Sequence, residues 1–333
     1  MKFFQIQNRR YTGSKFKLLN WIYGEINKNE NFNSFLDPFS GTGCVVQKFL
    51  NYKKIIINDF LDSNFIIYKA FFNSKKYDLK KLIDLANQFN SLKINNLKDN
   101  YFSINFSKKY FSYNDSKLIG YIREAINELN NITPDEKNIL LASLLYSVDR
   151  SANTVGHYDA YIIKDNIDDK FTFKLIEPYK TKSDIKIYNM DANELIKSET
   201  ADVIYVDPPY NSRQYGRFYH ILENLVKWEK PRLFGKALKP EPTHVSEYCK
   251  INAVNKFKEL VLNAKCKLLA VSYNNTYDSK SGSSKNKIAL EQILEILKIK
   301  GKTKINEKDY NFFNAGKTSF KNHKEYLFLT KVN

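Results

Sequence analysis

Val203-Ile-Tyr-Val-Asp-Pro-Pro-Tyr210 is the stretch that decides the fold. Its first four residues are apolar, which predicts a buried strand, and two prolines end that strand directly after Asp207. Open α/β sheets bind their ligands outside the carboxyl ends of the strands. We therefore expect the carboxylate of Asp207 and the ring of Tyr210 at that edge, held by the stiff turn of Pro208 and Pro209. The alternative is a plain turn, because Asp-Pro commonly opens one.

A second strand with a glycine turn precedes this stretch in the chain. Residues 34–37 predict a short strand that runs into Pro38-Phe39-Ser40-Gly41-Thr42-Gly43 and then a helix over 44–52. The two glycines let the backbone approach a ligand closely, and the amides at the helix start face the same place. The loop lacks the Gly-Lys-Ser/Thr ending of a Walker A motif and is not GxGxxG, which disfavours a nucleotide phosphate site.

Lys54-Ile-Ile-Ile-Asn58-Asp59 predicts a third strand, and it ends in a carboxylate. In nucleoside-binding α/β folds an acid at this place accepts hydrogen bonds from ribose hydroxyls. Asp59 is the candidate for that role. A helix cap is the alternative, since residues 60–72 predict a helix.

Tyr11-Thr-Gly-Ser-Lys15 predicts a small-residue turn before a helix that Ser14 could cap. Amides at such a helix start, with Lys15 beside them, suit a carboxylate or a phosphate. A capped surface helix without a ligand is the alternative.

Residues 74–182 have a different character from the strands and helices around them. Lysines alternate with aromatic residues over 74–110, which is typical of nucleic-acid contact but also of a charged helical surface, and helices are predicted over 116–129 and 134–146. The polar, aromatic loop 149–161 follows. It offers side chains that could read base edges or hold phosphates, although a structural Ω-loop is the alternative; they are Arg150, Asn153 and His157.

After residue 183 the chain returns to alternating strands and helices. Strands are predicted over 184–188 and 267–272, and two more, 302–310 and 325–331, predict a terminal hairpin around a loop with Phe312, Phe313 and Lys317. An amphipathic helix over 215–228 follows the Asp-Pro-Pro-Tyr turn. Arg213 and Arg217 lie near its start and put positive charge beside the predicted site.

Composition limits the classes of function. Lys plus Arg number 53 against 36 acids, a net charge of +17, which predicts an anionic partner such as nucleic acid. No stretch has 18 consecutive apolar residues, and the N-terminus has no long apolar run, so we expect a cytoplasmic protein without a membrane partner. The three cysteines and four histidines show no metal-ligand spacing, so we expect no metal.

Four motifs in this order resemble the Dam-like, alpha-group adenine-N6 DNA methyltransferases of restriction-modification systems: Tyr11-Thr-Gly-Ser-Lys15, Asp37-Pro-Phe-Ser-Gly-Thr-Gly43, Asp59 and Asp207-Pro-Pro-Tyr210. The resemblance covers most of the chain. It implies an α/β fold, a Rossmann-like S-adenosylmethionine-dependent methyltransferase sheet with a C-terminal antiparallel hairpin. It also implies an inserted, largely helical target-recognition domain, at 74–182, between the catalytic segments 1–73 and 183–333.

The resemblance also implies roles for residues. S-adenosyl-L-methionine would contact the glycine turn, the ribose acid and the first motif, which contribute Tyr11, Lys15, Asp37, Pro38, Phe39, Gly41, Thr42, Gly43 and Asp59. Asp191 resembles the acid that contacts the cofactor's adenine. Asn275 lies in Ser272-Tyr-Asn-Asn275, which resembles a segment near the target pocket.

The implied reaction is methyl transfer to adenine N6 of a base flipped out of double-stranded DNA, by a monomer, which would protect DNA from a cognate restriction enzyme. Asp207 and the Pro208 carbonyl would accept the amino hydrogens, and Tyr210 would stack on the base. The rivals are the same chemistry on cytosine N4, on an RNA adenine or on a glutamine side chain, and a nucleic-acid-binding module without catalysis. Asp, rather than Ser or Asn, before Pro-Pro resembles the adenine enzymes.

Overall fold

The computed structural model describes residues 2–28, 30–243, 245–276, 285–309 and 323–333. The chain divides into two compact units. The first, here called the sheet unit, comprises residues 15–60, 181–215 and 244–333. The second, the helical unit, comprises residues 1–14, 61–180 and 216–243.

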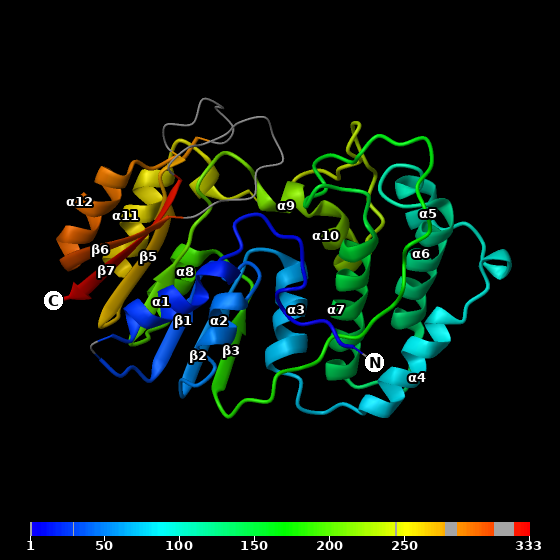
Figure 1. Cartoon of the computed structure of the whole chain (residues 1–333), viewed down its shortest axis with the longest axis horizontal. Coiled ribbons are helices and arrows are strands. Elements are labelled where there is room, and N and C mark those ends of the chain that lie inside the picture. Colours follow the sequence, from blue (N-terminus) through cyan, green and yellow to red (C-terminus); the bar gives the residue numbers. More distant parts are fainter. Residues whose placement is uncertain (1, 29, 244, 277–284, 310–322) are drawn as a thin grey trace. The chain divides into compact units, whose positions relative to one another are not determined.

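A seven-stranded sheet forms the centre of the sheet unit, with the strand order β3-β2-β1-β4-β5-β7-β6 (Figure 1). The neighbours from β3 to β5 pair in parallel, and β7 runs antiparallel to both β5 and β6. This confirms the predicted α/β sheet and its terminal hairpin. The strands are β1 (Ser34–Asp37), β2 (Lys54–Asn58), β3 (Asp184–Tyr188), β4 (Val203–Val206), β5 (Leu268–Asn274), β6 (Gly301–Asp309) and β7 (Lys324–Val332).

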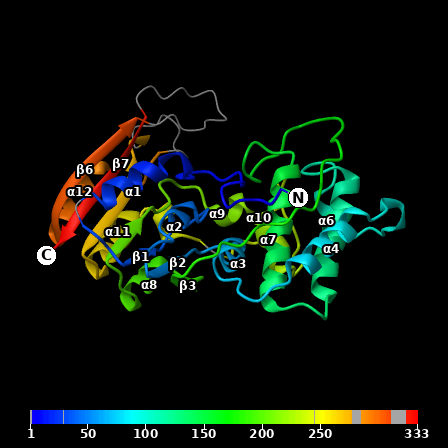
Figure 2. The same cartoon turned by 60° about the horizontal axis from the view of Figure 1, so that its bottom comes forward.

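Helices cover both faces of this sheet, as parallel strands require. One face is covered by α8 (Ala192–Ser198), α11 (Ala253–Asn263) and α12 (Leu290–Lys300) (Figure 2). Their apolar side chains form one core with Leu36, Ile204 and other strand residues. On the other face, Phe49, next to α2 (Cys44–Lys48), stacks on Phe35 with ring centroids 4.1 Å apart. The ring of Tyr23 in α1 (Leu19–Ile26) lies 5.0 Å from the Phe49 ring, measured between centroids. Residues 203–206 are buried throughout, which explains their continuous apolar run.

The helical unit packs α3 (Asp62–Phe72) against α7 (Pro134–Ser151), with Phe71 and Tyr146 5.5 Å apart between ring centroids. Thr133 caps α7 in a capping box with Glu136. The other helices described in this unit are α4 (Leu79–Asn90), η2 (Ile94–Asn96), α5 (Tyr101–Phe106), α6 (Tyr113–Glu128) and α10 (His220–Lys227).

Some predicted helices are interrupted in the structure. Residues 215–228 form α9 (Tyr215–Phe218) and α10, separated at Tyr219. The ring of Tyr219 stacks on Tyr11 and its hydroxyl accepts the Thr12 N–H at 2.8 Å, so a tertiary contact breaks the helical pattern.

Two more helices begin or divide differently from the prediction. The apolar pattern of residues 247–264 also predicts one helix, and the structure divides it into η3 (Glu247–Cys249) and α11. The first helix begins as η1 (Phe16–Leu18) without a side-chain cap. Phe312, Phe313 and Lys317 lie outside the described residues.

Candidate functional site

Three carboxylates lie at the carboxyl ends of three neighbouring strands of the sheet unit. Asp37 ends β1, Asp59 follows β2, and Asp207 follows β4. Asp37 and Asp59 are buried, at 1% and 8% exposed. Burial raises the pKa of Asp37 well above its ordinary value, and the negative charges of Asp207 and Asp59 act in the same direction. This edge of the sheet therefore gathers three acidic groups whose charges oppose one another.

Lys15 is a buried cation against this cluster. Its Nζ lies 3.0 Å from Oδ2 of Asp207, and its side chain is 5% exposed. The same ammonium lies 4.9 Å from the centre of the Tyr210 ring, and the Tyr210 hydroxyl donates to Oδ1 of Asp207. Both carboxylate oxygens of Asp207 therefore have a partner in the structure. The Tyr210 ring lies against Tyr273 of β5, with 4.4 Å between ring centroids.

The glycine turn is joined to Asp59 by a hydrogen bond. Gly41 and Gly43 have φ angles of 53° and 76°, a left-handed backbone that glycine adopts without strain. The Gly41 N–H donates to Oδ2 of Asp59 at 2.8 Å. Asp59 thus fixes the turn between β1 and α2. The N-cap of the helix after it is Leu61, which disfavours the alternative that Asp59 is a helix cap.

Phe39 and Asp191 both lie close to Tyr248, beside the glycine turn. The rings of Phe39 and Tyr248 meet edge to face at 5.0 Å, and the Asp191 charge acts on the Tyr248 hydroxyl. Asp191 is the N-cap of α8 and accepts the Asn193 N–H at 2.8 Å. The remaining turn residues are in the same segment: Pro38 accepts a hydrogen bond from the Asn58 amide on its carbonyl, and Thr42 is buried.

Two predicted DNA-contacting residues belong to the sheet unit. Asn275 follows β5, and its Oδ1 accepts the Lys324 N–H at 3.0 Å. Arg213 lies after the Asp-Pro-Pro-Tyr turn, where its carbonyl accepts a hydrogen bond from the Cys249 thiol. Asn275 is thus attached to the start of β7.

The other predicted contact residues belong to the helical unit. Arg150 is exposed at the end of α7, and Arg217 donates from Nη1 to the Pro240 carbonyl at 3.3 Å. His157 stacks on Phe218, with 4.5 Å between ring centroids. Asn153 is buried, and its amide donates to the carbonyls of Lys109 and Ile162 at 3.0 and 2.7 Å, so it ties the end of its own loop to the segment before α6.

Tyr11 of the helical unit is half-buried. Its ring stacks on Tyr219, with 4.7 Å between centroids, and the Arg9 guanidinium lies 5.3 Å from the ring centre on a side chain that is 7% exposed.

Glu325 of β7 is a charged neighbour of the Asp207 cluster that the motifs did not reveal. It is 4% exposed, and the charges of Lys15 and Asp207 both act on it. The sequence contains a signal for its burial. Glu325 and Leu327 are two residues apart in a strand, so their side chains lie on the same face, and that face is buried.

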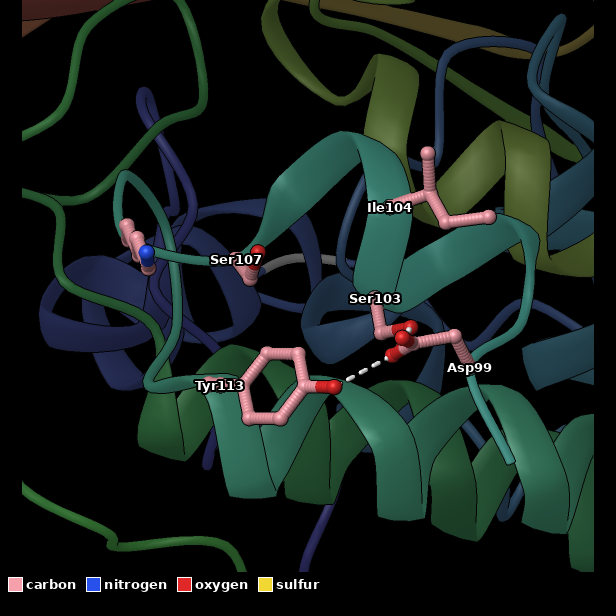
Figure 3. Close-up of a pocket in the computed structure, with 6 residues that line it drawn as sticks. Asp99, Ser103, Ile104, Ser107 and Tyr113 are labelled. Carbon is pink, nitrogen blue, oxygen red and sulfur yellow. Dashed lines mark hydrogen bonds between the residues drawn. The ribbon is translucent and has the colours of Figure 1, made fainter. Parts of the chain in front are cut away.

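A separate hollow lies in the helical unit between α5 and α6 (Figure 3). Tyr113 and Ser103 both donate hydroxyl hydrogen bonds to Oδ1 of Asp99 there, at 2.7 and 3.0 Å. None of the motif residues lines it. Across the described part of the chain, no three His, Cys, Asp or Glu side chains gather as metal ligands, and no helix there has the length and apolarity to cross a membrane.

Comparison with known proteins shows the family of the chain. The model of the D12 class N6 adenine-specific DNA methyltransferases matches residues 11–277, which include the Tyr11–Lys15 turn, the glycine turn, Asp59 and the Asp-Pro-Pro-Tyr turn. This chain belongs to that family. As a D12 class methyltransferase it is an adenine-specific DNA-modifying enzyme, and the resemblance seen in its motifs is confirmed.

Type II methyltransferases of other organisms match most of the chain. The type II methyltransferase M.NlaIII of Neisseria lactamica is 32% identical over 96% of this chain and 98% of its own. M.CviAII of Paramecium bursaria Chlorella virus 1 is 29% identical over 97% and 98%. M.FokI of Planomicrobium okeanokoites is 32% identical over 88% of this chain, which corresponds to 47% of that protein.

Proposed function

We propose that this methyltransferase transfers the methyl group of S-adenosyl-L-methionine to adenine N6 in double-stranded DNA, with Asp207, Pro208, Pro209 and Tyr210 as its catalytic turn. The observation that carries the proposal is the position of Asp207. It lies at the end of a buried central strand, beside the β1 turn that Asp59 fixes through the Gly41 N–H. Adjacent strand ends are where α/β sheets bind nucleoside ligands and their reacting partners.

The charges of this strand edge suit the cofactor. S-adenosylmethionine carries a positive sulfonium and an ammonium group, and Asp37, Asp59 and Asp207 lie at the same strand edge as the buried cation Lys15. Asp59 has a carboxylate suited to ribose hydroxyls, and Gly41 and Gly43 keep the turn free of side chains. Phe39 and Asp191 would contact the adenine ring, and Tyr11 and Lys15 the methionine end.

When bound, S-adenosylmethionine would supply an activated methyl group for transfer from its sulfur to N6. This chain's residues act on the acceptor. Adenine N6 is a poor nucleophile because its lone pair is delocalised into the ring. Asp207 and the Pro208 carbonyl would accept its two hydrogens, which localises the lone pair and stabilises the positive charge that develops on N6. The proton that N6 loses passes through Asp207 to water, so the carboxylate is restored.

Tyr210 would hold the flipped base. Unstacking a base costs a few kcal/mol, and stacking on an aromatic ring is worth about 1–3 kcal/mol, so the ring offsets much of that cost. The contact of Tyr210 with Tyr273 and its hydrogen bond to Asp207 limit the orientations of the ring. A fixed ring loses little conformational entropy on binding.

The insertion 74–182 would recognise the target DNA, together with residues of the catalytic segment 183–333. The net charge of +17 favours a polyanion, and Arg150, His157, Arg213, Arg217 and Asn275 are the side chains we assign to DNA contact. Asn153 would contribute by holding the loop that carries His157, because both of its amide donor contacts are made within the helical unit. Its relatives include type II restriction-modification methyltransferases, and we assign this chain the same protective role against a cognate restriction enzyme.

Mass spectrometry of nucleosides tests this function. Unmethylated duplex DNA is incubated with the protein and S-adenosylmethionine and then digested to nucleosides. We expect N6-methyldeoxyadenosine. Formation of N4-methyldeoxycytidine would correct the target base, and a product found only with RNA or protein would overturn the DNA assignment.

A further inference from the structure

We infer that Glu325 is a positioning residue, the alternative counter-ion that takes the Lys15 ammonium when the target amino group reaches Asp207. The inference rests on the proposed role of Asp207. It assigns a function to a buried carboxylate of the C-terminal hairpin, outside the motifs at the ends of β1, β2 and β4.

Glu325 is an acid in an unfavourable place. Glu325 is 4% exposed, and its Oε2 has no hydrogen-bond partner among the described residues. A buried carboxylate oxygen without a partner costs free energy that an apolar or amide side chain would not. Buried acids of this kind are common at functional sites.

The groups that act on this carboxyl belong to the proposed catalytic turn. Burial raises the pKa of Glu325 to about 7; the Lys15 charge lowers this pKa, the Asp207 charge raises it, and the Asn274 side chain donates a hydrogen bond to it. The charge of Glu325 in turn raises the pKa of Tyr205 in β4 and of Tyr210 in the turn. On β6 its cross-strand neighbour is Lys308, and His323 lies two residues before it.

The arrangement has two acids for one buried cation. Lys15 pairs with Asp207 at 3.0 Å and also lies over the Tyr210 ring. While this ion pair lasts, the negative charge that Asp207 can offer to a positive N6 is largely neutralised. Glu325 pairs across the sheet with Asn274 of β5, the residue after the Tyr273 that contacts Tyr210. This second acid would let the ammonium leave Asp207 without becoming an unpaired buried charge, which would cost several kcal/mol. Asp207 then faces the amino group with its full charge.

The inference predicts a dependence on Glu325 ionisation. A protonated Glu325 cannot receive Lys15, so the rate of methyl transfer should rise as pH rises through about 7. We would measure single-turnover transfer to unmethylated duplex DNA between pH 5.5 and 9, together with S-adenosylmethionine affinity by calorimetry. The Glu325→Gln variant keeps the shape of the side chain and cannot ionise.

We expect Glu325→Gln to transfer the methyl group roughly tenfold more slowly than wild type at pH 8, as for loss of a directly coupled charge. Its transfer rate should not rise as pH passes through 7. Its affinity for S-adenosylmethionine should be unchanged. Glu307→Gln is the matched control, because it makes the same change on β6 at an exposed side chain paired with Lys324. This control should behave as wild type. Glu325→Asp should recover the rise with pH.

A double-variant cycle separates this role from simple packing. In a Lys15→Met background no ammonium remains to be exchanged, so adding Glu325→Gln should not slow the reaction further. Equal wild-type and Glu325→Gln rates and pH profiles would overturn the inference, as would full additivity of the two substitutions. A wild-type protein that forms no N6-methyladenine at any pH would instead refute the proposed function.

Discussion

The Lys15 ammonium lies 3.0 Å from Oδ2 of Asp207, and the two side chains are 5% and 16% exposed. This ion pair joins the first motif of the chain to the last, across almost 200 residues of sequence. Because the pair is buried, removing one partner leaves an uncompensated charge, whereas exposed pairs contribute little. The pair therefore holds the catalytic turn in place and also sets how much negative charge Asp207 can present.

Replacing Asp59 should weaken cofactor binding. Asp59→Ala removes the proposed ribose acceptor and leaves the Gly41 N–H without its partner. We expect the Kd for S-adenosylmethionine, measured by calorimetry, to rise roughly tenfold or more, since an unsatisfied buried group costs about 1–3 kcal/mol. Asp84→Ala is the control, because Asp84 is exposed on α4 and pairs only with Lys80 among the described salt bridges. Unchanged affinity in Asp59→Ala would refute the assignment.

Two glycine substitutions should change stability in opposite directions. Gly24 is inside α1, and a Cβ there meets nothing within 4 Å, so Gly24→Ala should gain about 0.5–1 kcal/mol in unfolding free energy. At Gly301 a Cβ would lie 2.0 Å from the Lys331 carbonyl oxygen, so Gly301→Ala should lose stability as β6 and β7 separate. Urea titration measures both. A Gly301→Ala variant with the unfolding free energy of wild type would contradict the pairing of β6 with β7.

Glu325 should make the free protein less stable at alkaline pH. Burial raises its pKa to about 7 from an ordinary 4.5, so the folded protein binds this proton more tightly than the unfolded chain does. The resulting stability is present below about pH 4.5 and is lost as pH rises through about 7. Glu325→Gln should therefore be more stable than wild type at pH 8 and nearly equal at pH 5. Denaturant titrations without cofactor or DNA measure this, and parallel pH curves for the two proteins would contradict it.

Arg150 should contribute to DNA affinity through a phosphate. It is exposed at the end of α7, and we expect Arg150→Ala to reduce the slope of log affinity against log salt by about 1. Fluorescence anisotropy with a labelled duplex at several salt concentrations measures the slope. Lys298→Ala changes an exposed cation on α12 and should leave the slope unchanged. Equal slopes for Arg150→Ala and wild type would exclude this contact.

Local signals in the sequence were sufficient for most of the sheet. Residues 184–188 and 203–206 are strands with the predicted bounds, because apolar or β-branched runs there end at clear turn residues. The helix over 215–228 was predicted without its break, since the break at Tyr219 arises from a stack with Tyr11 more than 200 residues away. Helix propensity and hydrophobic periodicity depend only on nearby residues in the sequence, so they cannot predict such a contact.

The same limit applies to the candidate site. The motifs predicted a carboxylate after β1, β2 and β4, and the sheet order brings these strand ends next to one another. The ion pair of Lys15 with Asp207 could not be read from spacing, because it depends on the folded path of residues 11–18. Asn153 looked like a base reader, and only the structure reveals that two backbone carbonyls accept its amide hydrogens.

The central claim is that Asp207 supplies the charge that drives transfer to adenine N6. The most direct test is single-turnover methyl transfer by Asp207→Ala, with S-adenosylmethionine affinity measured on the same preparation. We predict cofactor binding close to wild type and an N6-methyladenine rate lower by roughly a hundredfold or more, as for loss of a group that stabilises developing charge. A wild-type transfer rate in Asp207→Ala would contradict the account.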